Sequence, residues 1–592
     1  MDTIHGLKRT NYCNDLNMDF VDKEVTLMGW VQRARDLGGL LFIDLRDRSG
    51  LVQITFDVND DKTLFEKSKE VGSEYVIAVR GKVRERSAKN PNLATGDIEV
   101  VATELRILNG AKTPPIYIKD DDTVSEDLRL KYRYLDLRKP KMQYNFMMRH
   151  KVMQSVRNFL SSEGFLEIET PILTKPTPEG ARDYLVPSRV NKGHFYALPQ
   201  SPQLFKQLLM TSGMDRYFQI AKCFRDEDLR ADRQPEFTQI DCEMSFVEID
   251  DVLDVTERLM QKVFKDVLDV DIKLPLKRMT WQEAMDRYGS DKPDIRFGFE
   301  INDVSEVVKD SGFKVFEEAL AAGGTVRGIN LNAVEEQFSR KAIDALGEVA
   351  KLYGAKGLAW IRINKEGVNS PIAKFLSEDN MKNLIEKMGG KEGDLLVFVA
   401  DKTSVALNAL GHIRLEAAKK LDIINKDEFS FLYVVKFPLY EFDEENERYV
   451  AAHHPFTAPV DEDMDMFDTT PEKMHAKAYD IVLNGVELGG GSIRIHTKEI
   501  QDKMFKALGF TQEEAEEKFG FLLNAFQYGT PPHGGIAFGL DRMLMLMLKR
   551  DSIREVIAFP KNQNAICPLT DAPAFADEKA LDELGVAVVK EK

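Results

Sequence analysis

The chain has 592 residues, of which 43% are hydrophobic and 30% charged, and its formal net charge is −17. This length exceeds a single hydrophobic core and predicts three or four domains. The negative charge argues against non-specific nucleic-acid binding, which requires a basic surface that displaces phosphate counterions. Residues 1–110 carry 16 Lys+Arg and 18 Asp+Glu, a net charge of 16 − 18 = −2, so an RNA site meets the least repulsion there.

No stretch of the sequence has the pattern of a transmembrane or secretory segment. The longest apolar run is interrupted by Asp541 and Arg542, which makes it too short and too charged to span a bilayer. Residues 1–5 do not provide a basic region followed by an apolar core. We therefore expect a cytoplasmic protein. Its cysteines lack paired spacing and are expected to be reduced thiols: Cys13, Cys223, Cys242 and Cys567.

Residues 1–110 are predicted to form a small closed β-barrel of the oligonucleotide-binding (OB) type. Five short strand-like runs are separated by Gly- and Asp-rich turns, which suits such a barrel better than a sandwich. The runs are 25–31, 40–44, 51–56, 75–86 and 98–108. Periodicity alone leaves open whether Phe42 is a core residue or lies on the surface. Cations interleaved with an aromatic residue are typical of surfaces that stack unpaired bases: Arg33, Arg35, Phe42, Arg46, Arg48 and Gln53.

A charged hairpin is predicted over residues 217–246. Residues 217–225 are extended in character, and residues 226–236 contain five acids and two arginines that end in a Pro-containing turn. From residue 237 to 246, apolar and polar residues alternate with the period of a strand, so Asp241 and Glu243 fall on the same face. The general alternative is a solvated surface hairpin, because most charge runs lie in solvent.

A second hairpin is predicted near the C-terminal end of the chain. The pair Asn484–Gly485 between two alternating runs is a strong hairpin signal, and it places Asp480 and Glu487 on adjacent strands. Residues 489–491 are three glycines, which either let a ligand approach the backbone or mark a bulge. Asp541 is predicted to cap a helix with Arg542 in its first turn, where a cation is unfavourable unless an anion binds beside it.

Three of these stretches together resemble the class II aminoacyl-tRNA synthetases. Residues 224–227 and 233–239 look like motif 2, in the form found in the bacterial aspartyl enzymes of subclass IIb. Residues 534–542 resemble motif 3 and residues 164–171 resemble motif 1, in the order of that family. A single match would be weak, but three matches in order across nearly four hundred residues indicate membership.

The resemblance implies a multidomain α+β fold with an OB barrel, a catalytic domain built on an antiparallel sheet, and an α/β insertion domain. It implies a ligase that activates L-aspartate with ATP and transfers it to the 3′ end of tRNA(Asp), working as a homodimer with Mg²⁺. The expected regions are an anticodon-binding domain (1–110), a hinge (111–140), a first catalytic segment (141–288), the insertion (289–421), and a second catalytic segment with a C-terminal tail (422–592).

The resemblance also assigns roles to individual residues. Catalytic roles fall on Arg225, Arg542 and Glu487, and metal binding on Asp480 and Glu487. The expected L-aspartate contacts are Glu179, Gln203, Lys206, Arg225, Asp241, His453 and Arg494. The expected ATP contacts are Arg225, Asp226, Glu227, Gln234, Phe237, Glu487, Gly539, Leu540, Asp541 and Arg542. The expected anticodon contacts are Arg33, Arg35, Leu37, Phe42 and Gln53.

Two other functions remain possible from the sequence: a sister synthetase for asparagine or lysine, and a non-catalytic RNA-binding regulator on the same scaffold. The insertion favours the aspartyl enzyme over its sisters, and intact Arg225 and Arg542 argue against the regulator. Leu37 resembles the leucine of family members that charge only tRNA(Asp), where a histidine often marks enzymes that also charge tRNA(Asn). We therefore expect the strict specificity.

Overall fold

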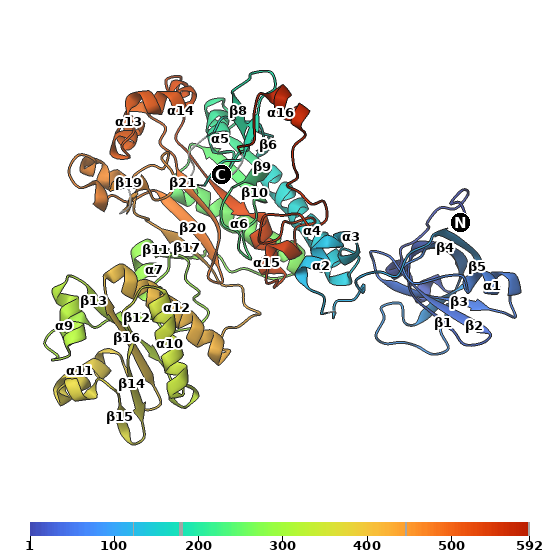
Figure 1. Cartoon of the computed structure of the whole chain (residues 1–592), viewed down its shortest axis with the longest axis horizontal. Coiled ribbons are helices and arrows are strands. Elements are labelled where there is room, and N and C mark those ends of the chain that lie inside the picture. The colour runs from blue at the N-terminus through green and yellow to red at the C-terminus, as the bar shows by residue number, and fades with distance from the viewer. Residues whose placement is uncertain (122, 177–180, 444–446, 590–592) are drawn as a thin grey trace. The chain divides into compact units, whose positions relative to one another are not determined.

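The computed structural model describes residues 1–121, 123–176, 181–443 and 447–589 (Figure 1). The chain divides into two compact units, which are described separately. The first unit contains residues 1–150, 229–234 and 550–577, and the second contains residues 151–228, 235–549 and 578–592. Among the described residues, no helix combines the length and apolar character needed to cross a membrane.

The first unit contains the expected closed barrel. Its strands follow the order β1-β2-β3-β5-β4, and alternate residues of each strand fill a single apolar core. The fold prediction for residues 1–110 is confirmed. The elements are β1 (Glu24–Asp36), β2 (Leu40–Arg46), β3 (Leu51–Asp57), α1 (Lys62–Ser68), β4 (Val76–Glu85) and β5 (Ile98–Asn109).

The segment after the barrel is helical and packs against the C-terminal residues of the same unit. It contains α2 (Glu126–Lys131), α3 (Arg133–Asp136) and the start of α4 (Pro140–Ser162). Arg133 is buried and donates to the carbonyl oxygens of Arg554, Ile557 and Ala558 at 2.5–2.9 Å. The expected hinge is therefore fixed to residues 554–558 by hydrogen bonds to backbone.

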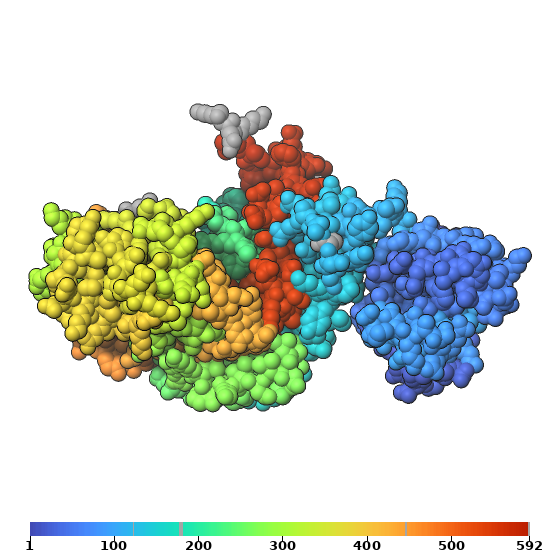
Figure 2. All heavy atoms as spheres, turned by 90° about the horizontal axis from the view of Figure 1, so that it is seen from below, coloured from blue at the N-terminus to red at the C-terminus, as the bar shows by residue number. Residues whose placement is uncertain are grey.

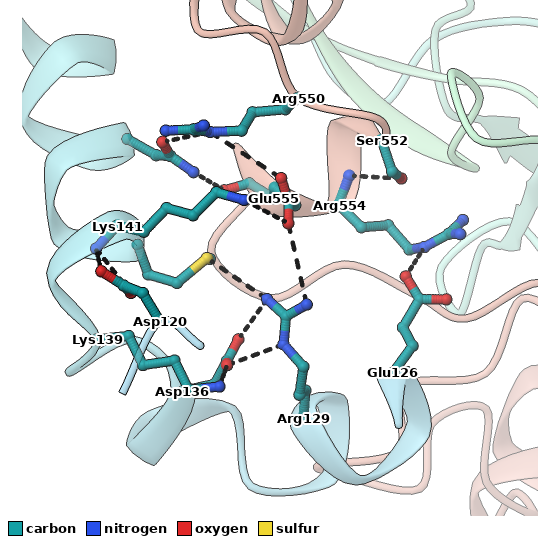
Figure 3. A network of polar contacts seen from close by, with 12 residues as sticks. Asp120, Glu126, Arg129, Asp136, Lys139, Lys141, Arg550, Ser552, Arg554 and Glu555 are labelled. Carbon is teal, nitrogen blue, oxygen red and sulfur yellow. Dashed lines mark hydrogen bonds and ion pairs between the residues drawn. The ribbon is translucent and has the colours of Figure 1, made fainter. Parts of the chain in front are cut away.

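A network of charges completes this contact (Figure 3). Asp136 is fully buried and accepts from Arg129 at 2.9 Å, and Lys139 approaches it at 3.0 Å. Arg129 also lies 3.9 Å from Glu555, which Lys141 approaches at 3.6 Å. Burial opposes the shift, but Arg129, Lys139 and Arg133, which lies 2.7 Å away, together lower the pKa of the Asp136 carboxyl.

The second unit is built on an eight-stranded sheet with the order β11-β17-β20-β21-β22-β10-β9-β6. Most neighbours are antiparallel, while β11 pairs with β17, and β6 with β9, in parallel. The sequence of residues 165–173, which runs in extended character into Pro171, predicts a strand there, but β6 covers only two residues of it. The strands are β6 (Leu166–Glu167), β9 (Arg216–Phe224), β10 (Glu236–Ser245), β11 (Lys277–Thr280), β17 (Phe431–Val435), β20 (Ala478–Leu483), β21 (Val486–Ile493) and β22 (His533–Gly539).

Helices and two small ribbons surround this sheet. The buried face of α6 lies against the sheet, and α13 and α14 form a helical pair that packs on α5 through a cluster of phenylalanines. The elements are β7 (Leu185–Pro187), β8 (Phe195–Ala197), α5 (Gln203–Thr211), α6 (Ile249–Leu268), α7 (Trp281–Tyr288), β18 (Tyr440–Asp443), β19 (Arg448–Ala451), α13 (Lys498–Ala507), α14 (Gln512–Phe526), α15 (Leu540–Met547) and α16 (Glu578–Leu584).

The expected α/β insertion is also present in the second unit. Its five strands follow the order β12-β13-β16-β14-β15, and it appears as a compact body (yellow in Figure 2). The fully buried Arg414 donates to the carbonyl oxygens of Asp294 and Phe297. The elements are β12 (Ile301–Asp303), α8 (Ser305–Val308), α9 (Lys314–Ala321), β13 (Thr325–Leu331), α10 (Arg340–Leu352), β14 (Ala359–Asn364), β15 (Gly367–Asn369), α11 (Glu378–Lys387), β16 (Leu395–Asp401) and α12 (Thr403–Leu421).

Candidate active site

The candidate site is built around β10, which lies between β9 and β22 in the sheet. Asp241 and Glu243 stand two residues apart on β10, so their side chains share one face as the sequence predicts. Both carboxylates are fully buried. The polar face of this strand is therefore an enclosed site and not the solvated surface of a charged hairpin.

Two buried cations face these two carboxylates. Lys206 from α5 lies 2.6 Å from Asp241 and 3.2 Å from Glu243. Arg494, which follows β21, donates from Nε and Nη2 to the two oxygens of Glu243 at 3.0 and 3.2 Å. The fold thus brings together three predicted aspartate-binding residues, and Glu243 connects the two cations.

Arg494 uses all five of its N–H groups within the protein. Nη1 donates to Ser492 at 2.6 Å and to Nε2 of His454 at 2.7 Å, and Nη2 makes a longer contact of 3.5 Å with the carbonyl oxygen of Gly535. The sequence analysis did not assign Glu243, His454 or Ser492. The two-residue spacing from Asp241 identifies the face that carries Glu243, whereas nothing in the sequence distinguishes His454 from His453.

The glycines next to Arg494 are explained by close packing. A Cβ atom on Gly535 would lie 2.1 Å from Oε2 of Glu243, and one on Gly490 would lie 2.4 Å from Oδ1 of Asp480. A larger residue at either position would displace a buried carboxylate. The triple glycine of β21 therefore makes room for protein carboxylate and backbone atoms, and our expectation that it opens a path for a ligand to the backbone is not needed to explain it.

The ion pairs determine the protonation states of the cluster. Burial alone would raise the pKa of Glu243, but Arg494 and Lys206 outweigh burial and lower this pKa to about 2. Burial lowers the pKa of His453 to about 4, and the positive charge of Arg494 contributes to the shift. Burial and Arg494 also lower the pKa of His454 well below its usual range. Both imidazoles are therefore neutral near pH 7.

Several buried polar atoms of the predicted site have no hydrogen-bond partner among the described residues. They are Nε2 of Gln203, Oδ2 of Asp241, Nε of Arg225 and Oδ1 of Asp480. Each unsatisfied buried polar group costs about 1–3 kcal/mol, so each of these atoms is available to a ligand that supplies its missing partner. The four atoms include both donors and acceptors.

Arg225 and Phe237 lie together at one end of β9 and β10. The guanidinium carbon of Arg225 is 5.1 Å from the centre of the Phe237 ring, within range of a cation–π contact. Both side chains are partly exposed. This pair can present a cation and an aromatic face to a nucleotide, as the resemblance implies.

Arg542 lies in the first turn of α15, as predicted, but the helix is capped differently from our expectation. The N-cap is Gly539, and Leu540 is the first helical residue. Asp541 instead accepts from the backbone N–H of Thr238 at 2.8 Å and so ties α15 to β10. Arg542 donates from Nη1 to the carbonyl oxygen of Glu487 at 2.7 Å, which brings two predicted ATP-binding residues together.

Asp480 and Glu487 form the candidate metal site. They lie on paired strands, and burial together with the Glu487 charge raises the pKa of Asp480 well above its usual range. A carboxylate held in this way is stabilised in its ionised form by a bound cation, and its Oδ1, which has no hydrogen-bond partner in the described part of the chain and lies 3.8 Å from Nε2 of His453, is an oxygen ligand of the kind that Mg²⁺ prefers. The described residues contain no group of three or more His, Cys, Asp or Glu able to hold a metal without additional ligands. The site therefore fits a cation that a nucleotide phosphate completes.

The other predicted contacts are less informative. Asp226 follows β9, and its backbone N–H donates to the carbonyl oxygen of Arg182 at 3.1 Å, while Glu227 lies next to it and is partly exposed. Gln234 belongs to the first unit, where its buried amide pairs with the backbone of Lys561. Glu179 lies outside the described residues.

The barrel carries the predicted anticodon contacts on its outer face. Leu41 and Ile43 point into the core and Phe42 points outward, so Phe42 is not a core residue. The guanidinium carbon of Arg35 lies 5.9 Å from the Phe42 ring, and Arg35 donates to Asp44 at 3.0 Å and to Gln53 at 3.2 Å. Arg35 and Phe42 thus lie together on this face, whereas Gln53 is only 5% exposed and is hydrogen-bonded to Arg35.

Two other barrel residues are exposed, and one cation is placed elsewhere. Arg33 is exposed, and Leu37, at the turn between β1 and β2, is 72% exposed. We expected Arg46 to belong to the same base-binding surface. It is instead buried in an ion pair with Glu74 at 2.7 Å. Two additional residues, Arg86 and Glu99, hydrogen bond to Gln53 at 3.1 and 2.7 Å and were not predicted.

Comparison with known proteins places this site in a family. A profile described as tRNA synthetases class II (D, K and N) matches residues 125–563, and an OB-fold nucleic acid binding domain matches residues 25–108. A protein of Ruminiclostridium cellulolyticum named aspartate–tRNA ligase is 60% identical over 593 residues, covering 100% of both chains. A protein of Lachnoclostridium phytofermentans named aspartate–tRNA(Asp/Asn) ligase is also 60% identical, covering 100% of this chain and 99% of its own.

The fold is shared with more distant solved structures. Asparaginyl-tRNA synthetase from Pyrococcus horikoshii, complexed with asparaginyl-adenylate, aligns with a TM-score of 0.59 at 19% identity, covering 94% of this chain and 98% of its own. At this identity the likeness concerns the fold alone. The family profile spans most of the chain, and the bacterial relatives match it over its whole length. The chain belongs to the class II tRNA synthetases of the D, K and N group.

Proposed function

We propose that this chain is an aspartate–tRNA ligase, which activates L-aspartate with ATP to form aspartyl-adenylate and pyrophosphate and then transfers aspartate to the 3′ end of tRNA(Asp). The observation that carries the proposal is the buried pair of cations, Lys206 and Arg494, beside polar atoms that lack partners. This arrangement suits a small ligand that carries both an ammonium group and carboxylates. The relatives named aspartate–tRNA ligase support the same substrate.

We propose that the substrate's ammonium group binds to the unpaired oxygen of Asp241, with the Gln203 amide beside it. Its side-chain carboxylate then lies between Lys206 and Arg494, near the neutral His453. Because every N–H of Arg494 already has an acceptor, the carboxylate must replace a contact of the terminal nitrogens. The longest is the 3.5 Å contact with Gly535, and it costs the least to exchange. Glu179 is proposed as a further contact for the ammonium group.

In the first reaction step, the α-carboxylate of aspartate attacks the α-phosphorus of ATP and pyrophosphate leaves. The carboxylate is already ionised, so catalysis consists of positioning and charge stabilisation. We propose that Arg225 and Arg542 bind the phosphates while Phe237 stacks on adenine. Asp226, Glu227, Gln234, Gly539, Leu540 and Asp541 are proposed to line or support the nucleotide site.

Mg²⁺ is the proposed cofactor, and Asp480 and Glu487 would hold it together with phosphate oxygens. When bound, the ion neutralises charge on the phosphates. The two carboxylates would hold the cation near Arg542, which donates to the backbone carbonyl oxygen of Glu487. In the second step, the terminal ribose hydroxyl of the tRNA attacks the mixed anhydride. We assign no side-chain base to this step, because the departing phosphate oxygen can accept the proton.

Further proposals concern organisation. We propose the boundaries 1–110, 111–140, 141–288, 289–421 and 422–592, supported by a barrel that ends at Asn109 and an insertion whose last helix ends at Leu421. A homodimer is proposed because exposed Leu166, Ile172 and Leu173 follow α4 at the edge of the sheet. We propose the cytoplasm as its location, because the charged tRNA is consumed there and the relatives are bacterial.

The direct test is aminoacylation. Purified chain, ATP, Mg²⁺ and labelled L-aspartate are mixed with transcribed tRNA(Asp), and acid-precipitable product is measured. We expect charging by the wild type and its loss in Arg225→Ala, with Arg278→Ala, an exposed arginine far along the chain from the site residues, as a control that retains activity. Charging of tRNA with asparagine or lysine instead would contradict the proposal.

A further inference from the structure

A two-stranded ribbon formed by β7 and β8 projects from the second unit and has no role in the site described above. Its pairs are Leu185 with Ala197, Val186 with Tyr196 and Pro187 with Phe195. The ribbon is closed by a turn in which Gly193 has a positive φ of 81°. Phe195 and Tyr196 are adjacent in sequence and therefore lie on opposite faces, and both are exposed, at 42% and 39%. The ribbon is partly covered by the rest of the chain, because Thr174 pairs with Ala197 at its base and Gly585 lies beside the Lys192 side chain at its tip.

The base of the ribbon is fixed next to Arg225. The backbone N–H of Asp226 donates to the carbonyl oxygen of Arg182 at 3.1 Å, and that of Phe224 donates to Pro199 at 2.9 Å. The buried amide of Gln200 donates to Ala181 and to the carboxylate of Asp183. Both legs of the ribbon are thus attached to the residues on either side of Arg225, the proposed ATP-binding arginine.

The tip of the ribbon is cationic. Arg189, Lys192 and His194 are exposed, and no carboxylate among the described residues lies within ion-pair distance of Arg189 or Lys192. Other exposed cations of the described residues, Lys341 and Lys382 among them, also lack a carboxylate partner, so unpaired charge alone does not single out the ribbon. Its tip combines two exposed cations with the two exposed aromatic rings of Phe195 and Tyr196.

We propose that the β7–β8 ribbon binds the acceptor arm of the substrate tRNA. Arg189 and Lys192 contact backbone phosphates, and Phe195 and Tyr196 stack on unpaired nucleotides near the 3′ end. Cations that neutralise phosphates, together with aromatic rings that stack on bases, are the usual means of binding single-stranded RNA. This inference rests on the proposed function, because it identifies the surface by which the same enzyme guides its RNA substrate.

The position of the ribbon favours RNA over a second copy of the chain. In the transfer step, the terminal ribose must reach the adenylate, so the 3′ end of the tRNA has to pass close to Arg225. The ribbon stands on the residues that flank Arg225, at the place where an incoming phosphate backbone needs neutralisation. A ribbon with cations at its tip would also repel an identical ribbon brought against it across a two-fold axis.

The test is a comparison of two charge-removing variants of the full-length enzyme. Arg189→Ala/Lys192→Ala removes the proposed phosphate contacts, and the control Lys341→Ala/Lys382→Ala removes two exposed lysines of the insertion. We expect kcat/KM for tRNA(Asp) to fall about 10- to 100-fold in the first variant and to stay unchanged in the control. The logarithmic salt dependence of tRNA binding should become shallower by roughly 1.4–1.8, because two phosphate contacts are lost. Phe195→Ala/Tyr196→Ala should lower kcat/KM by a similar factor with the salt dependence kept.

Aspartate-dependent pyrophosphate exchange separates this proposal from the proposed function, because that reaction needs no RNA. Unchanged exchange with weakened tRNA charging supports the ribbon as an RNA contact. Unchanged charging in both ribbon variants overturns it, and so does an equal loss of exchange and charging, which would mean that the active site was damaged. Sedimentation in which only the ribbon variants become monomeric would assign the ribbon to a protein interface instead. Absence of exchange and charging in the wild type would contradict the proposed function itself.

Discussion

Glu243 and Arg494 form a two-point ion pair, at 3.0 and 3.2 Å, in which both side chains are buried. Lys206 approaches the same carboxylate at 3.2 Å and also contacts Asp241. The two cations of the pocket are thus matched by two carboxylates of the protein. Under the proposed function, we expect the selection of aspartate to depend on where these charges are fixed, and Glu243 contacts both cations.

The effects of substituting Glu243 and Arg494 on the free energy of unfolding are expected to be strongly coupled. Glu243→Gln and Arg494→Leu each leave a buried charge without its partner, which typically costs roughly 3–5 kcal/mol. The double variant removes both charges of the pair. Its loss in free energy of unfolding should therefore be clearly smaller than the sum of the losses of the two single variants. Urea unfolding of the four proteins measures this coupling, and additive losses would show that the two residues act independently.

The same pair predicts an acid-dependent loss of stability. The folded pKa of Glu243, about 2, lies below its ordinary value of 4.5, so its contribution is complete above that value and is lost as the pH falls towards 2. Glu243→Gln should show a smaller change in urea midpoint over this interval than the wild type. An identical pH profile for the two proteins would contradict the assigned ion pair.

Amino-acid activation should depend on the geometry of Arg494. Arg494→Lys keeps the charge but loses the fork that holds Glu243, His454 and Ser492, and we expect aspartate-dependent pyrophosphate exchange to fall at least 100-fold. ATP binding, measured by equilibrium methods, should be nearly unchanged. Lys420→Arg on the exposed end of α12 is a matched control for a Lys/Arg exchange. Activity of Arg494→Lys close to that of the wild type would place the specificity pocket elsewhere.

Asp480 should link metal binding to pH. Burial and the charge of Glu487 raise its pKa, so protons compete with Mg²⁺, and the affinity for Mn²⁺ with a non-hydrolysable ATP analogue should rise as the pH rises. Without metal, ionisation of Asp480 opposes folding, and the cost grows as the pH rises. Asp480→Asn should therefore weaken the pH dependence of Mn²⁺ binding and raise the urea midpoint at pH 8. A lower midpoint at pH 8 would indicate that Asp480 is stabilised as an anion by the protein alone.

Phe42 should contribute to RNA binding and little to stability. It is on the outer face of β2, so Phe42→Ala should lower anticodon stem-loop binding by about 1–3 kcal/mol, as for the loss of a base stack, and leave the melting temperature nearly unchanged. The adjacent core residue gives the contrast, because Leu41→Ala should destabilise the barrel by about 2–5 kcal/mol. Loss of stability without loss of RNA binding in Phe42→Ala would contradict its placement on the RNA surface.

The sequence predicted the architecture better than it predicted the polar contacts. Alternation identified the barrel strands, and the Asn484–Gly485 pair identified the β20–β21 hairpin, because both signals are local. The length of strand β6 was overestimated, because β6 ends where its pairing with β9 stops and the sequence of β6 alone does not show that point. The cap of α15 was assigned to Asp541, yet that carboxylate is used by Thr238, a residue 303 positions away.

In the candidate site, the sequence likewise identified individual residues but not the contacts between residues far apart in the chain. Motif resemblance selected Lys206, Asp241 and Arg494, and the structure brings them together. It could not show that Glu243 connects the cations or that His454 accepts from Arg494, because these contacts join residues 251 and 40 positions apart. Periodicity also left Phe42 undecided between core and surface, and only the closed barrel determines which face is inside.

The tRNA range of the enzyme is expected to be narrow. Leu37 is exposed at the tip of the β1–β2 turn, where its side chain can meet an anticodon base. The relatives at 60% identity carry names of both specificities, so identity does not decide this point. We expect purified tRNA(Asn) to be charged far more slowly than tRNA(Asp), and Leu37→His to reduce the difference. Similar charging of both tRNAs by the wild type would contradict the strict specificity.

The most direct test of the whole account is amino-acid-dependent ATP–pyrophosphate exchange with each of the twenty amino acids. It measures the first reaction step without tRNA and therefore reports on the proposed aspartate and ATP sites and not on the RNA surfaces. We predict exchange with L-aspartate and a response to L-asparagine lower by roughly 10⁴-fold, because the amide NH₂ would face the N–H donors of Lys206 and Arg494, where aspartate presents a carboxylate oxygen. Exchange driven by asparagine or lysine, or no exchange with any amino acid, would contradict the account.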